Sequence, residues 1–206
     1  KTIKSPLWAK IVILLYTTLG LASCDSFVEV DLPKSQLTSV LVFENNQTAN
    51  AALMDIYGKL RDNGMLNGTS LGLSQQLGLY ADELNYLGSS ASVQSFYNNS
   101  LVATNTTIAS IWNIAYAEIY ATNAVIEGVR ASAMLTANDK KQLEGQALFL
   151  RGLIHFYLVN LFGDIPYLIT TNYNQNRAAS KFTVEVVYDK INADLKEAAT
   201  LIGDTE

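Results

Sequence analysis

Few side chains of this sequence have the type and spacing that catalysis requires. Asp82 and Glu83 are adjacent carboxyl groups, the residue type that glycoside hydrolysis uses in pairs. Neighbouring positions do not by themselves place two carboxylates roughly 5 Å, or roughly 6.5–9.5 Å, apart across a sugar. His155 lies between Ile154 and Phe156, with no second His and no acid pair nearby. We therefore expect His155 to be packed or at an interface, and not to act as a base or a metal ligand.

Composition excludes several further classes of site. The 206 residues include one Cys and one His, which excludes an intramolecular disulfide and a multi-cysteine zinc or iron–sulfur site. P-loop, dinucleotide and H-E-x-x-H motifs do not occur in the sequence. The net charge of −5 argues against a nucleic-acid partner. We expect no catalytic residue, no cofactor and no metal.

The single cysteine follows a segment that is typical of secretion. Lys1, Lys4 and Lys10 precede the apolar run 11–22. That run is shorter than the about 20 residues that cross a bilayer. A basic start, a short apolar stretch and small residues together predict a signal peptide over 1–23.

The residues Leu21-Ala22-Ser23-Cys24 resemble the lipobox of bacterial lipoproteins. This resemblance implies that the Cys24 thiol receives a diacylglycerol and that the signal is cleaved before it. Several acyl chains anchor a protein stably in a membrane. The alternative is a buried cysteine at the end of a membrane-anchor helix. Residues 24–45 contain Pro33 and no sustained period, so we expect a lipidated tether there.

Residues 46–206 predict helices joined by irregular loops, an all-α fold. We expect a helix over 47–62, capped by Asn46, with an inward apolar stripe of Ala49, Leu53, Ile56 and Leu60. A second helix is expected over 70–87. Thr106 or Thr107 is expected to cap the next helix, and Thr136-x-x-Asp139 begins another, which Gly163 ends. Thr183 caps a last helix, which Gly203 ends. The predicted loops are 88–107 and 164–182.

Apolar residues recur three or four apart in the two central helices, which predicts an antiparallel hairpin. Trp112 and Tyr116 lie on the inward stripe and are expected in the core. Gly145 and Gly152 predict a close approach by another helix. Arg151 is expected to pair with an acid and orient the hairpin. The candidate partners are Glu118, Glu127 and Asp164.

The stretch LRGLIHFYLVNLFGDIPY, residues 150–167, resembles the signature of SusD/RagB lipoproteins. Further blocks resemble that family in the same order: YGKL (57–60), YADE (80–83), IWNIAY (111–116) with NAVIE (123–127), and VYDKINADL (187–195). Gly152 departs from the Ala that is common in the family. Members are more than twice as long, so the chain is expected to be a truncated N-terminal portion.

The resemblance implies tetratricopeptide-like helix pairs in an α-α superhelix. It also implies a surface-exposed, lipid-anchored protein of the outer membrane in Bacteroidetes. Such a protein captures oligosaccharides or other nutrients and passes them to a SusC-like TonB-dependent transporter.

Sugar recognition needs flat aromatic rings and fixed amide or carboxylate groups. The segment 80–107 has this mixture, and in the family the loops of this region contribute to glycan contacts. The candidate glycan-binding residues are Asp82, Asn85, Tyr86, Phe96, Tyr97 and Asn98. The alternative is a solvated loop whose aromatic residues anchor it to the body.

Two other functional classes stay open. A helical-repeat adaptor lipoprotein would hold protein partners and bind no sugar. A helical glycoside hydrolase would depend on Asp82 or Glu83.

Overall fold

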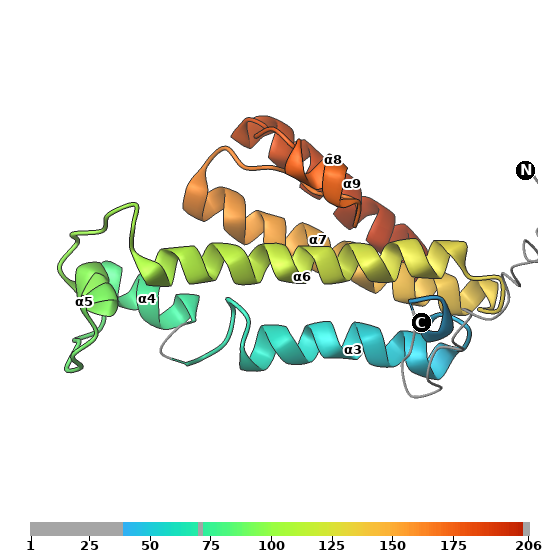
Figure 1. Ribbon diagram of the computed structural model, residues 1–206, viewed down its shortest axis with the longest axis horizontal. Helices are drawn as coiled ribbons and strands as arrows, with labels where there is room; N and C mark the ends of the chain where they lie inside the picture. The colour runs from blue at the N-terminus through green and yellow to red at the C-terminus, as the bar shows by residue number, and fades with distance from the viewer. Residues whose placement is uncertain (1–38, 70–71, 204–206) are drawn as a thin grey trace, which may run out of the picture. The chain divides into compact units, whose positions relative to one another are not determined.

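A computed structural model describes residues 39–69 and 72–203. The predicted signal segment, Cys24 and most of the predicted tether therefore lie outside the described residues. The described part is mostly helical, as predicted (Figure 1). Its helices are α2 (Ser39–Val42), α3 (Asn46–Asp62), α4 (Leu73–Tyr80), α5 (Ala91–Tyr97), α6 (Thr106–Ala131), α7 (Ala137–Phe162), α8 (Tyr173–Arg177) and α9 (Val184–Ile202).

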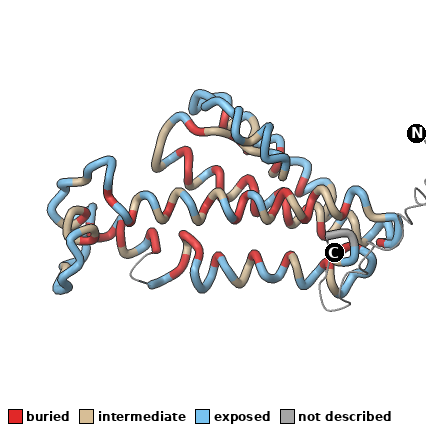
Figure 2. Tube along the Cα trace, in the orientation of Figure 1, coloured by how far each residue is buried: buried red, intermediate tan, exposed pale blue. Residues whose placement is uncertain are grey.

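Four long helices make the body of the fold. α6 and α7 form the predicted hairpin, α9 packs along α7, and α3 packs along α6 (Figure 1). Their buried residues face one another along these contacts (Figure 2). The predicted inward stripe of α3 is confirmed, and its buried members are Ala49, Leu53, Ile56 and Leu60. Burial of these apolar stripes is the main stabilising term for such amphipathic helices.

Side-chain caps fix where the long helices begin. Thr136 accepts a hydrogen bond from the Asp139 amide at 3.1 Å, which confirms the predicted start of α7. Two other predicted caps were wrong by a residue or two. Asn45, and not Asn46, accepts from the Thr48 amide at 2.9 Å. The cap of α6 is Asn105, and not Thr106 or Thr107.

The region between α3 and α6 differs most from the prediction. The helix expected over 70–87 is only the eight residues of α4. The 88–107 segment was predicted as a loop, but it contains α5. Val93 and Phe96 of α5 are buried and, with Leu79, form a small second cluster apart from the main core. α5 contributes only Val93 and Phe96 to this cluster, so its apolar residues repeat only once. The polar residues around them therefore hid the helical pattern in the sequence.

Arg151 of α7 lies at the centre of a buried hydrogen-bonded network. Its predicted partners Glu118, Glu127 and Asp164 were wrong, because its guanidinium pairs with Asp194 of α9. The Arg151 Nη1 donates to Asn123 Oδ1 at 2.9 Å, and the Tyr167 hydroxyl donates to Asp194 Oδ2 at 2.6 Å. The network thereby joins α6, α7, α9 and the segment that follows α7. These hydrogen bonds satisfy charged and polar groups that would be costly to bury without a partner.

His155 is fully buried and stacks on the Tyr167 ring, with 3.8 Å between ring centroids. The Leu168 amide donates to His155 Nε2 at 3.3 Å, so Nε2 carries no proton. Nδ1 then carries the proton and donates to the Arg151 carbonyl at 2.9 Å. This packed, structural role agrees with the sequence-based expectation.

Glycine residues allow α9 to approach α7 closely. A Cβ at Gly145 would lie 2.8 Å from Ile202 Cγ1, and one at Gly152 would lie 3.2 Å from Leu195 Cδ2. None of the helices in the described part is long and apolar enough to span a membrane.

Candidate functional site

The predicted binding segment begins with a tight turn after α4. The Gly78 carbonyl accepts from the Glu83 amide at 2.9 Å and from the Leu84 amide at 3.1 Å. Asp82 adopts the left-handed conformation at φ 59°, which Asp tolerates better than most residues. A Cβ at Gly78 would lie 2.9 Å from Leu84 Cδ1, so the glycine lets the turn fold back on α4. The turn presents Asp82 and Asn85 to solvent.

Hydrogen bonds then join this turn to α5. The Tyr97 hydroxyl donates to Asn85 Oδ1 at 3.2 Å. Asn98 Oδ1 accepts from the Gln94 side chain at 3.0 Å. The Tyr86 hydroxyl accepts from the Ser90 amide at 2.9 Å, one residue before α5. The structure therefore brings Asn85 next to Tyr97, and it fixes Tyr86 against the same short helix.

Phe96 differs from the other five predicted residues. It is 5% exposed and packs with Leu79 and Val93, so its ring does not lie on the surface. Tyr86 and Tyr97 pack against the same cluster but are only partly buried. Phe96 thus lies in the small cluster beneath the surface, whereas the two tyrosines are partly exposed beside it.

A shallow groove of about 410 Å³ runs along this surface. Its walls include the predicted residue Asn85 and two polar residues of α4, Ser74 and Gln75. Sequence reasoning did not select Ser74 or Gln75, because only the fold places the first turns of α4 beside the 82–88 turn. Hydroxyl and amide groups along an open groove suit a neutral, hydroxylated ligand. We refer to Ser74, Gln75, Asp82, Asn85, Tyr86, Tyr97 and Asn98 as the α4–α5 surface.

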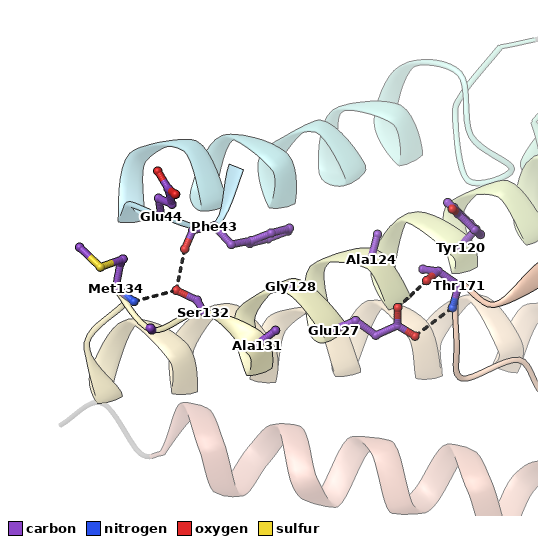
Figure 3. A pocket seen from close by; sticks show the side chains of 11 residues that line it. Phe43, Glu44, Tyr120, Ala124, Glu127, Gly128, Ala131, Ser132, Met134 and Thr171 are labelled. Atoms are coloured by element: carbon purple, nitrogen blue, oxygen red, sulfur yellow. Dashed lines mark hydrogen bonds between the residues drawn. The ribbon is translucent and has the colours of Figure 1, made fainter. Parts of the chain in front are cut away.

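A larger cavity, of about 560 Å³, lies where Phe43 and Glu44, directly after α2, meet the second half of α6 (Figure 3). It contains none of the predicted site residues. Its exposed aromatic and thioether side chains are Tyr120 and Met134. Phe43, directly after α2, covers Gly128 of α6, where any Cβ would overlap the ring.

The polar groups of this cavity are largely engaged with one another. The Glu127 carboxylate accepts hydrogen bonds from the Thr171 amide, at 2.9 Å, and from its hydroxyl (Figure 3). Burial raises the pKa of Glu127, but these hydrogen bonds lower it more, so the group stays ionised. The Ser132 hydroxyl donates to the Phe43 carbonyl at 2.6 Å. The polar groups of this cavity therefore connect neighbouring segments of the fold and do not form a preformed polar site.

Carboxyl groups and metal ligands are the side chains that would support chemistry other than binding. Asp82 and Glu83 are both exposed beside the turn. Across the residues that the structure describes, no group of three His, Cys, Asp or Glu side chains could hold a metal ion. The α4–α5 surface offers hydroxyl, amide and carboxylate groups beside two partly exposed tyrosines.

Comparisons with known proteins identify relatives of this chain. Two SusD-like proteins of Formosa agariphila are 26% identical over 200 residues and 23% identical over 167 residues. These alignments cover 95% and 76% of this chain, but only 38% and 31% of the relatives. The chain thus spans about a third of the length of the curated relatives that it matches.

Solved structures show the same fold. A laminarin-binding SusD-like protein matches with a TM-score of 0.69 at 23% identity, over 77% of this chain and 34% of that one. A SusD superfamily protein of Bacteroides vulgatus matches with a TM-score of 0.65 at 23% identity, over 80% and 36% of the two chains.

A family model shows the family to which this chain belongs. The SusD-like model described as "Starch-binding associating with outer membrane" matches residues 31–206, which is most of the sequence. This chain belongs to that SusD-like family.

Proposed function

We propose that this chain belongs to a cell-surface lipoprotein that captures oligosaccharides and passes them to a TonB-dependent transporter of the outer membrane. The observation that carries the proposal is the family match over residues 31–206, whose description names starch binding and the outer membrane. A surface glycan-binding protein of Bacteroides fluxus with the same fold, at a TM-score of 0.63, supports it. The protein would bind its ligand without chemical change.

The α4–α5 surface is the proposed contact for the oligosaccharide within this chain. Asn85 lines the groove, and its Oδ1 accepts a hydrogen bond from the Tyr97 hydroxyl at 3.2 Å. The Tyr86 side chain packs against the small cluster of Leu79, Val93 and Phe96 and is partly exposed. A sugar ring could lie against the tyrosines while Asn85 and Gln75 hydrogen-bond to its hydroxyls.

Affinity gel electrophoresis against a polysaccharide panel tests this proposal. The panel contains starch and laminarin, because the family description and one structural neighbour name these glucans. We expect retardation by at least one glucan, and at least about a tenfold weaker interaction for Asn85→Ala or Tyr86→Ala. Tyr120→Ala is the matched control, since this exposed tyrosine lies in the other cavity. Equal retardation of all variants would exclude the α4–α5 surface.

The membrane anchor is a separate part of the proposal and has its own test. Cys24 would carry the lipid that holds the protein on the outer membrane, exposed at the cell surface. Radiolabelled palmitate should label the wild-type chain and not Cys24→Ala. Co-purification with a transporter from outer membranes would test the hand-off, and a chain that never co-purifies would contradict it.

One observation favours the alternative of an adaptor that binds protein partners. Leu84 and Leu87 are 45% and 97% exposed in the turn between α4 and α5. Exposed leucines are unusual contacts for a hydroxylated ligand but suit an apolar protein surface. A Leu87→Ser variant, which lies outside the groove, should keep glucan retardation under the first proposal and lose a protein partner under the second.

A further inference from the structure

Glu118 of α6 is a buried carboxyl group that has no hydrogen-bond partner among the described residues. The residue is 4% exposed, and neither Oε1 nor Oε2 has a partner. Its Oε1 lies against Gly64, just beyond the end of α3, where any Cβ would overlap it. An ionised carboxylate buried without a partner costs several kcal/mol. The packed arrangement therefore suits the neutral acid.

The ionised form has a possible partner nearby. Lys59 of α3 lines the same cavity of about 290 Å³ as Glu118 and Asn63. In the packed arrangement, Lys59 Nζ instead pairs with Asp55 at 2.6 Å, and both side chains are more than half exposed. An exposed pair of this kind contributes little and exchanges readily.

Few other charges act on Glu118. Residues 63–69 and α4 contain no charged side chain. Arg151 of α7 is occupied by Asp194 and Asn123, and Glu127, further along α6, is held by Thr171. Burial raises the pKa of Glu118 to about 7, and the charge of Lys59 opposes that rise.

The backbone that Glu118 supports leads directly into α4. The Gly64 carbonyl accepts from the Asn67 side chain at 2.6 Å. Asn67 Oδ1 in turn accepts from the Thr69 amide at 2.8 Å. The Met65 carbonyl accepts from the amide of Leu73, the first residue of α4, at 2.9 Å. A movement of Gly64 would therefore change the connection that positions α4.

We propose that Glu118 is a pH-sensitive switch for the connection between α3 and α4. In its neutral form, Glu118 packs beneath Gly64 and holds residues 63–69 on α6. On losing its proton to solvent, the carboxylate turns into the cavity toward Lys59 and releases Gly64. The start of α4 then loses its fixed position.

Nuclear magnetic resonance on the purified full chain tests the switch. The Glu118 carboxyl carbon and the amides of Gly64 and Asn67 should titrate together, with a midpoint within about one unit of pH 7. In Glu118→Gln, an uncharged isostere that retains the packing, the amide titration should disappear. Lys59→Met should raise the midpoint, because it removes the partner of the ionised form.

Three results would overturn the proposal. They are an unchanged amide titration in Glu118→Gln, a Glu118 midpoint below about 5, typical of an exposed carboxyl, and an unmoved midpoint in Lys59→Met. Glu44→Gln is the control for nonspecific charge effects, because Glu44 is exposed and precedes α3. It should titrate like the wild type, and loss of the amide titration in this control would also overturn the assignment to Glu118.

Discussion

Arg151 and Asp194 form a bidentate ion pair in the interior, where Nε and Nη2 of the guanidinium each lie 2.7 Å from a carboxylate oxygen. Both side chains are less than one-tenth exposed. The fork of the guanidinium matches the two oxygens, which fixes the rotation of α9 against α7. Burial of such a pair adds more to the uniqueness of the packing than to its net stability.

Asp194→Ala should lower the free energy of unfolding by about 3–5 kcal/mol. The substitution leaves the Arg151 charge buried and removes the acceptor of the Tyr167 hydroxyl. Urea denaturation followed by circular dichroism measures the change. Glu197→Ala is the control, because its exposed pairing with Arg130 at 3.2 Å should be worth less than about 1 kcal/mol. Similar losses in both variants would contradict the assigned role.

Glu118 should make the protein less stable as the pH rises from about 4.5 to about 7. Its folded-state pKa lies above its unfolded value, so the folded state binds more protons in this window and deprotonation favours unfolding. We expect Glu118→Gln to be more stable than the wild type at pH 8 by about 1–3 kcal/mol. Urea titrations at pH 5 and pH 8 measure this, and equal pH dependence in the two proteins would argue against it.

His155 should have the opposite effect over an overlapping range. Burial lowers its pKa from 6.5 to about 4. Its stabilising contribution is therefore present above pH 6.5 and is lost as the pH falls toward 4. The imidazole Hε1 resonance should stay that of the neutral ring from pH 8 to pH 5. A midpoint near 6.5 would show that the ring is not enclosed as described.

Alanine substitutions at three helical glycines should separate helix propensity from packing. Gly58 has no atom within 4 Å of an added Cβ, so Gly58→Ala should stabilise the protein by about 1 kcal/mol. Gly145→Ala should be destabilising by about 1–2 kcal/mol, because its Cβ would meet Ile202 and the Ala198 carbonyl. Gly152→Ala should lie between the two, since the Leu195 side chain can shift. Thermal denaturation gives the order, and equal effects would contradict it.

The long helices were predictable because their apolar residues repeat over many turns. The stripe of α3 and the start of α7 agree with the prediction. Neighbouring Asn45 and Asn46 are chemically equivalent caps, so only the fold distinguishes them. Asp194 was missed because an acid in an amphipathic helix normally faces solvent. Its place three residues after the buried Ile191 was the available signal.

The candidate site could be predicted only in part. Residues 82–98 are close in sequence, so local structure was sufficient to bring Asn85 and Tyr97 together. The contribution of Ser74 and Gln75 depends on how the chain turns after Gly78, which the polar composition did not indicate. Phe96 was predicted to contact glycan through its aromatic ring, but the residue is buried in the small cluster beneath the surface.

The contact of Phe43 with Gly128 has a mechanical consequence. Phe43 directly follows α2, and its carbonyl is also held by Ser132 at 2.6 Å. A pulling force applied at Ser39 would meet this contact and also the hydrogen bond that the Thr48 hydroxyl of α3 donates to the Val42 carbonyl at 2.6 Å. The ring is 7% exposed and lies where any side chain at position 128 would collide with it. The load would therefore be shared between α6 and α3.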